Sequence, residues 1–335
     1  MDPTPSISAP SLFSLAGQNV LITGATRGTN YSFIPIWLCC IGAACALALA
    51  EAGASVCLVQ RNTPEGSQPN HESLNTIRAT GVKAEVVYCD LDNTEAVKGL
   101  FQKALDVMNG QIHVLVNCAG IQRRSPSVDF PESDWDDVLN VNLKSVWLLC
   151  QAAGRHMVPL RRGKIINFCS LLTFQGGLTV PAYASAKGAL GQLTKALSNE
   201  WSQHNVQPPH LPWVTPSSPF SRSVPELARV YLSPSSSLAR THACTLALLP
   251  SHVHSRVPAN QLPPSSSSSS SSSPFPRNER LLADPVRLRQ ISERIPAGRW
   301  GDPKDFAGPV VFLASSASQY VCGELLLVDG GWMGR

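Results

Sequence analysis

Short apolar runs alternate with longer helical patterns along most of this chain, and this alternation limits its fold more than any other feature. Residues 19–22 form an apolar run, and residues 41–52 have the period of a helix. Further runs follow at 55–59, 74–79, 84–88, 114–117 and 164–168. Strands that alternate with helices predict the α/β class, with a doubly wound parallel sheet covered on both faces. Ligands of such sheets bind at the carboxyl ends of the strands.

Two stretches interrupt the alternation. Residues 29–40 are an apolar insert between a strand with its glycine turn, 20–28, and the helix expected to follow at once. Residues 208–277 hold 13 of the 27 prolines and 19 serines, a composition that cannot offset chain entropy by burial, so we expect them to be mostly disordered. Without both stretches about 250 residues remain, which predicts a single domain over 1–335 with two inserts.

Charge and cysteine usage restrict the partners and the compartment. Residues 208–277 contain five arginines and one glutamate, so the formal net charge of +4 lies within this stretch and the rest of the chain is neutral. This distribution gives no reason to expect a nucleic-acid partner. The ten cysteines occur singly in apolar runs without metal-ligand spacing, which favours reduced thiols in the cytoplasm and no metal site.

A glycine-rich turn follows the first strand. It reads Thr23-Gly24-Ala25-Thr26-Arg27-Gly28 and becomes Gly-x-x-x-Gly-Ile-Gly when Ile41-Gly42 is joined to it. Glycines let such a backbone approach a pyrophosphate, whose charge is stabilised by N–H groups at the helix start. We therefore expect a dinucleotide cofactor there, with an ordinary strand-to-helix turn as the alternative; the predicted cofactor residues are Gly24, Arg27, Gly28 and Gly42.

Two further groups follow later strands. Asn117-Cys118-Ala119-Gly120 ends an apolar strand, and its small residues would let a ribose or adenine lie close. Asp90 follows residues 86–88 and would accept a hydrogen bond from an adenine amino group. We predict that Asp90, Asn117, Ala119 and Gly120 contribute to the cofactor site.

The most specific pattern is Ser170 at a strand end, followed 13 residues later by Tyr183 and then Lys187. A spacing of four places Tyr183 and Lys187 on one helical face. A phenol ionises near pH 10, and lowering its pKa to about 7 requires roughly 4 kcal/mol of stabilisation of the phenolate. One ammonium about 4 Å away supplies roughly that amount. Tyr183 is then a candidate general acid/base for a substrate hydroxyl, with Ser170 holding the same oxygen.

These motifs together resemble the short-chain dehydrogenase/reductase family, over residues 15–207 apart from the first insert and again from about 281 to 335. The resemblance implies a Rossmann-type fold, an NAD(P)-dependent oxidoreductase and a homotetramer or other homo-oligomer. It also implies that Asn142 holds a water in a proton relay toward Lys187. Ser170, Tyr183 and Lys187 complete the implied catalytic set, and Tyr183 and Lys187 also contact the cofactor.

The choice between NADP and NAD depends on the end of the second strand. NAD-preferring family members carry an acid there, whereas this chain has Gln60 followed by Arg61. Because arginine pairs with a 2′-phosphate, Arg61 favours NADP, although the side chain could equally face solvent.

Residues 170–177 and 294–301 resemble the 2-deoxy-gluconate and gluconate dehydrogenases, which implies a sugar-acid substrate. Ser170 and Gln175 would be its polar contacts. Reduction of 3-oxoacyl groups or other ketones is the alternative enzyme reading.

Two other hypotheses remain. Residues 33–50 are 18 residues without a charge, near the length of a membrane span, but Pro35 and the small residues beyond it favour a buried helix beside an insert. The second is a catalytically impaired, non-enzymatic form, in which intron sequence read in frame produces both inserts. The first insert would then displace residues 41–42 from the glycine turn, or the insert would have to bulge out for the chain to return to the turn. The second would remove an interior strand and its Pro-Gly turn, and leave the final strand, 325–328, undocked.

Overall fold

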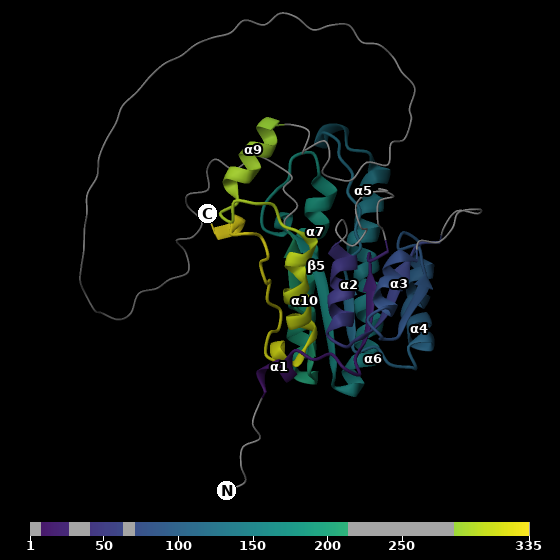
Figure 1. The fold of residues 1–335 in the computed structure, drawn as a ribbon. Coiled ribbons are helices and arrows are strands. Elements are labelled where there is room, and N and C mark those ends of the chain that lie inside the picture. The colour runs from purple at the N-terminus through teal and green to yellow at the C-terminus, as the bar shows by residue number, and fades with distance from the viewer. Residues whose placement is uncertain (1–7, 27–40, 63–70, 214–284, 335) are drawn as a thin grey trace, which may run out of the picture. The chain divides into compact units, whose positions relative to one another are not determined.

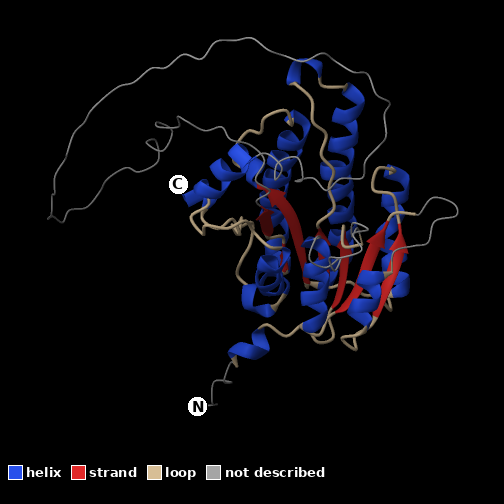
Figure 2. Ribbon diagram, turned by 45° about the horizontal axis from the view of Figure 1, so that its top comes forward, coloured by secondary structure: helices blue, strands red, loops and turns tan. Residues whose placement is uncertain are grey.

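The computed structural model describes residues 8–26, 41–62, 71–213 and 285–334, which all belong to one compact unit of the chain. Its parallel sheet has the strand order β3-β2-β1-β4-β5-β6, with β7 also paired to β5 (Figures 1 and 2). The doubly wound, Rossmann-type α/β fold predicted from the sequence is confirmed. The strands are β1 (Asn19–Thr23), β2 (Ser55–Gln60), β3 (Ala84–Tyr88), β4 (Val114–Asn117), β5 (Gly163–Ser170), β6 (Val206–Gln207) and β7 (His210–Trp213).

Helices cover both faces of the sheet. One layer holds α2 (Ile41–Glu51), α3 (Glu72–Arg78) and α10 (Ala307–Ala314), and the other holds α4 (Thr94–Val107), α6 (Ser145–Leu160) and α7 (Pro181–Trp201). The remaining helices are α1 (Ala9–Leu12), α5 (Glu132–Leu139) and α9 (Pro285–Arg294), with a π-helical turn at Asn140–Lys144 and 3-10 turns at Ser127–Asp129, Leu171–Thr173, Ser202–His204, Pro303–Phe306, Ser316–Ser318 and Trp332–Gly334.

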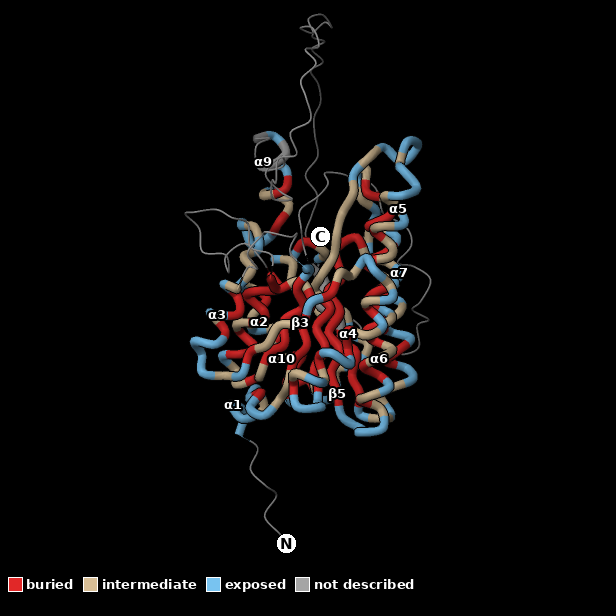
Figure 3. Tube along the Cα trace, turned by 90° about the vertical axis from the view of Figure 1, so that its right-hand side faces the viewer, coloured by how far each residue is buried: buried red, intermediate tan, exposed pale blue. Residues whose placement is uncertain are grey.

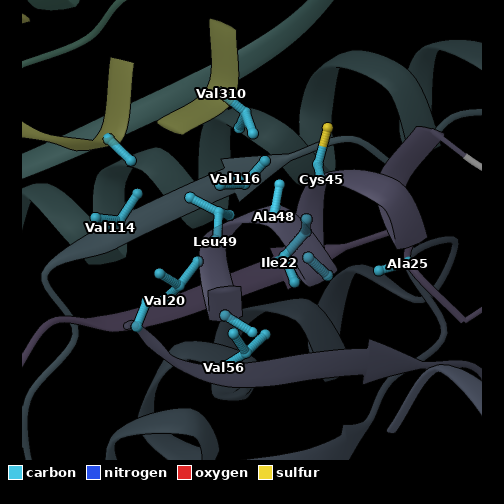
Figure 4. Packing of buried hydrophobic residues seen from close by; sticks show 14 of the residues in the cluster. Val20, Ile22, Ala25, Cys45, Ala48, Leu49, Val56, Val114, Val116 and Val310 are labelled. Atoms are coloured by element: carbon cyan, nitrogen blue, oxygen red, sulfur yellow. The ribbon is translucent and has the colours of Figure 1, made fainter. Parts of the chain in front are cut away.

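The two-residue period of β1 sorts its side chains between these layers. Val20 and Ile22 face α2, while Leu21 packs in the opposite core with α4. Figure 4 shows Val20 and Ile22 near Leu49 of α2, and Figure 3 shows the strands as a buried centre. Because the central strands are buried on both faces, most of their side chains are apolar, as is usual for parallel strands, although β5 also buries the polar Lys164 and Asn167.

The expectation that an interior strand is missing after α7 is wrong in part: a strand does follow α7, but within the described residues it is the outer strand of the sheet. Val206–Gln207 pairs with the start of β5, and His210–Trp213 pairs with its end, so two short strands occupy that edge of β5. Pro208 and Pro209 only divide them: the Pro209 carbonyl still accepts the N–H of Asn167 at 3.3 Å. Proline is tolerated because, within the described residues, this is the outer strand of the sheet.

The last predicted strand, 325–328, does not form a ladder. Only Leu325 and Val328 are isolated bridge residues. Leu326 and Val328 nevertheless pack against the core that contains α2, and the N–H of Gly323 donates to the Pro208 carbonyl at 3.2 Å. In the described residues the segment is therefore held by packing and isolated bridges rather than by a continuous strand ladder.

Several sequence predictions lie outside the described residues: the roles of Arg27 and Gly28, the insert at 29–40, and most of the disorder expected for 208–277. For residues 208–213 that expectation of disorder is wrong, because His210–Trp213 pairs with β5. Ile41–Glu51, the later part of the apolar run 33–50, is a helix buried in the core. No helix in the described ranges has both the length and the apolar character of a membrane span.

Candidate active site

The site is built where β1, β4 and β5 end. These three strands are parallel neighbours, so Thr23, Asn117 and Ser170 lie at the same edge of the sheet. The polypeptide leaves that edge in a glycine turn after β1, a small-residue loop after β4 and a 3-10 turn after β5. This is the edge at which doubly wound sheets bind their ligands.

The glycine turn and the loop after β4 touch through their backbones. Gly24 has φ +76°, and a Cβ there would lie 2.7 Å from the Cα of Ala119. The Thr23 hydroxyl fixes the same contact, because its Oγ1 accepts the N–H groups of Cys118 (3.2 Å) and Ala119 (3.1 Å). Only glycine therefore satisfies position 24, and the two predicted cofactor segments form one surface.

The start of α2 packs directly on this turn. A Cβ on Gly42 would lie 2.8 Å from the carbonyl carbon of Gly24 and 3.1 Å from the Cα of Ala25. The possibility that residues 41–42 are displaced from the turn is therefore wrong. The first N–H groups of an α-helix have no partner within the helix, and here they lie beside the turn, as pyrophosphate binding requires.

Helix α7 places Tyr183 and Lys187 one turn apart. It begins at Pro181, a residue favoured in the first helical turn, and both side chains are buried, with exposures of 6% and 4%. Lys187 Nζ donates to the Phe168 carbonyl of β5 at 2.6 Å and lies 5.8 Å from the centroid of the Tyr183 ring. The strand thus holds the ammonium beside the phenol.

Ser170 ends β5, and among the described residues its hydroxyl hydrogen has no acceptor. Its Oγ accepts the N–H of Leu172 at 3.2 Å, and its own N–H donates to Thr173 Oγ1 at 3.2 Å. Thr173 Oγ1 in turn donates to the Lys187 carbonyl at 3.0 Å, which ties the strand end to α7. Sequence reasoning missed Thr173, although the Ser-x-x-Thr spacing of a capping box could have revealed it.

Asn142 fixes the loop after β4 from the π-helical turn, a distortion common at functional sites. Its Oδ1 accepts the Ile121 N–H at 2.7 Å, and its Nδ2 donates to the Ile121 carbonyl at 2.8 Å. A Cβ on Gly120 would lie 3.1 Å from Asn142 Oδ1 and 4.0 Å from Lys187 Nζ. The structure therefore brings Gly120, Asn142 and Lys187 together.

Asn117 lies below this surface rather than on it. The side chain is 2% exposed, and its Nδ2 donates to Asn167 Oδ1 at 2.9 Å, while Asn167 Nδ2 donates to Thr194 Oγ1 at 2.6 Å. This buried chain links β4, β5 and α7. Asn117 supports the site from within, and no local sequence pattern pointed to its partners Asn167 and Thr194.

Arg61 and Asp90 form an ion pair of 3.0 Å, with about half of each side chain exposed. A 2′-phosphate that binds Arg61 would share it with Asp90. The neighbouring Gln60 is 5% exposed, and its Oε1 has no hydrogen-bond partner in the described part of the chain. Gln175, the predicted substrate contact, follows the 3-10 turn after β5 and is half-buried.

Two cysteines near the site, Cys169 and Cys150, are deeply buried. Burial raises the pKa of Cys169 to about 11, against a lowering effect of the Lys187 charge, and burial raises the pKa of Cys150 to about 12. Both thiols stay protonated at neutral pH. The described residues include no cluster of His, Cys, Asp and Glu that could hold a metal ion, and their cysteines form no disulfide.

The model of the short chain dehydrogenase family matches residues 18–208, more than half of the chain. The chain belongs to the short-chain dehydrogenase family. A second model, described as enoyl-(acyl carrier protein) reductase, matches residues 275–333 of this family member.

Curated relatives of this dehydrogenase cover it nearly end to end. The 2-dehydro-3-deoxy-D-gluconate 5-dehydrogenase of Pseudoalteromonas atlantica is 37% identical, over 96% of this chain and 98% of its own length. The gluconate 5-dehydrogenase of Gluconobacter oxydans is 32% identical over 97% and 98%. Among solved structures, a gluconate 5-dehydrogenase of Burkholderia cenocepacia in complex with NADP and tartrate is 28% identical, covers 98% of this chain and 100% of its own, and has a TM-score of 0.70.

Proposed function

We propose that this chain transfers a hydride between NADP and a secondary alcohol or ketone of a sugar acid related to gluconate. The observation that carries the proposal is the convergence of Ser170, Tyr183 and Lys187 at the end of β5. The relatives named for gluconate and 2-dehydro-3-deoxy-gluconate support the substrate class, and the NADP-bound structure supports the cofactor.

The residues present fit a dinucleotide. Gly24, Gly42 and Gly120 leave the surface without side chains where a Cβ would strike backbone or Asn142, and the start of α2 offers N–H groups to a pyrophosphate. Arg61, with Asp90 beside it, is the charge available to a 2′-phosphate. NADP supplies the carbon that gives or accepts the hydride. Lys187 lies close to Gly120, so its ammonium can donate to ribose hydroxyls in addition to stabilising the Tyr183 phenolate.

Proton transfer falls to Tyr183. The Lys187 charge, held by the Phe168 carbonyl, stabilises the negative charge that develops on the phenol oxygen when it gives its proton to the substrate. Ser170 Oγ already accepts from Leu172, so its hydrogen remains to be donated to the same substrate oxygen. Asn142 keeps a second N–H and a second lone pair for the relay water.

Gln175 is the proposed donor for substrate hydroxyls, because it lies in the segment that connects Ser170 to α7. We further propose a homo-oligomer, as family members commonly form tetramers, and a cytoplasmic location, which agrees with the lack of disulfides among the cysteines of the described ranges. The proposed domain organisation remains one domain with inserts at 29–40 and 208–277, of which 208–213 contributes to the sheet.

A catalytically impaired form is the second candidate. It is favoured by the absence of a strand ladder at Leu325–Val328 within the described residues. A comparison of this chain with a version that lacks residues 29–40 and carries a Pro-Gly strand segment in place of 208–277 tests it. Equal cofactor affinity and equal turnover in the two proteins would argue against an impairment caused by the inserts.

The direct test of the proposed function is the rate of NADP reduction with gluconate and with 2-dehydro-3-deoxy-gluconate, compared with the rate of NADPH oxidation by a 3-oxoacyl thioester. We expect turnover with a sugar acid. Activity confined to the thioester would favour the alternative ketone reductase.

A further inference from the structure

A polar cavity lies at the edge of the sheet opposite the candidate active site. It has a volume of about 70 Å³ and is bordered by the amino ends of β4, β5 and β6 and by the end of α10. Its lining includes Lys164, Arg162 and His113, together with amide groups of Asn205 and Gln207. Of the described residues that line it, none is acidic. Nothing in the proposed reaction uses these groups.

Lys164 is the unusual member of this lining. The residue is 7% exposed, and its Nζ donates to both the carbonyl (3.1 Å) and the hydroxyl (3.0 Å) of Ser318. An ammonium has three N–H donors, so one remains. No carboxylate in the described ranges pairs with it. An uncompensated buried charge is costly, and burial lowers the pKa of Lys164 to about 8.

Arg162 and His113 add donors to the same cavity. The ring Nδ1 of His113 accepts the N–H of Asn19 at 2.9 Å, so the neutral ring carries its proton on Nε2. Burial, followed by the charges of Arg162 and His156, lowers the pKa of His113, which keeps the ring neutral. The charge of the Cys322 thiolate acts against the effect of burial and raises the pKa of Lys164.

The size of the cavity agrees with a small ligand. One water needs about 10 to 15 Å³ of such volume, so about 70 Å³ holds several waters or one anion of five heavy atoms. We propose that this cavity binds a tetrahedral oxyanion, phosphate or sulfate, between the Lys164 ammonium and the Arg162 guanidinium. The anion supplies the counter-charge that the described residues do not provide.

Sulfate is the best probe, because its charge does not change between pH 6 and 10. Isothermal titration calorimetry on the full chain, at constant ionic strength set with NaCl, is expected to show binding at pH 7 that weakens on the order of tenfold by pH 9.5, as Lys164 loses its proton. Lys164→Met is expected to abolish this binding. Lys98 is an exposed residue of α4 that pairs with Glu95, so Lys98→Met also removes one positive charge. This control variant is expected to bind sulfate as the unaltered chain does.

Phosphate is expected to compete with sulfate, whereas acetate is not. Sulfate binding that is unchanged in Lys164→Met would overturn the proposal. If that variant fails to fold, binding by the unaltered chain that does not depend on pH would overturn it equally, as would binding of acetate in preference to sulfate.

Discussion

The contact between Gly42 and the glycine turn can be tested by adding a single methyl group. In Gly42→Ala the new Cβ would lie 2.8 Å from the carbonyl carbon of Gly24 and 3.1 Å from the Cα of Ala25, and both are backbone atoms that cannot rotate away. Overpacking of this kind costs about 1 to 3 kcal/mol. The turn or the start of α2 must shift, so the cofactor surface changes with it.

Gly99→Ala is the matched control. Gly99 also lies within a helix, α4, but a Cβ there would meet nothing within 4 Å. Replacing a helical glycine by alanine in open space stabilises by roughly 0.5 to 1 kcal/mol. We therefore expect Gly42→Ala to be about 1 to 3 kcal/mol less stable than Gly99→Ala in urea unfolding, and to bind NADP about tenfold more weakly. Equal stabilisation by both substitutions, with unchanged NADP affinity, would show that α2 does not pack on the turn.

Three further predictions follow from individual contacts. Burial lowers the pKa of Lys164 in the folded chain to about 8 from 10.5, so between these pH values the unfolded chain binds one proton more than the folded chain. The free energy of unfolding should therefore rise by up to roughly 3 kcal/mol as the pH increases from 8 to 10.5. Urea unfolding of Lys164→Met should not show this rise. Asn142→Ala leaves the N–H and carbonyl of Ile121 without their partner, so unfolding should become about 1 to 3 kcal/mol easier and kcat should fall; a thermal melt identical to the parent would contradict this. Arg61→Asp should weaken NADP binding more than NAD binding in parallel titrations, and equal effects on the two dissociation constants would show that Arg61 does not meet a 2′-phosphate.

The sequence predicted most of the sheet and the catalytic set because both depend on local patterns. Apolar runs identify β1 to β5, and the four-residue spacing of Tyr183 and Lys187 needs only a helix. The two proline-divided strands were missed because proline argues against a strand, whereas pairing with one side of β5 alone tolerates it. Local sequence does not show whether a strand will be an outer one.

Long-range contacts account for the other differences. Thr173 is an ordinary polar residue until the fold places its hydroxyl between Ser170 and the carbonyl of Lys187. The pairing of Asn117 with Asn167 likewise joins two strands 50 residues apart in the chain. The return of Gly42 to the glycine turn depends on packing of α2 against the sheet, which the length of the intervening insert did not reveal.

The most direct measurement of the central claim is the turnover of Tyr183→Phe with NADP and a gluconate-type substrate. The phenyl ring preserves the buried packing of Tyr183, so NADP affinity should stay unchanged, while kcat should fall by about 10² to 10⁴ because the proton donor is lost. Tyr320→Phe, which removes a hydroxyl from a fully exposed ring, is the control and should keep the parental rate. Parental turnover in Tyr183→Phe would contradict the assignment of Tyr183 as the acid/base of this site.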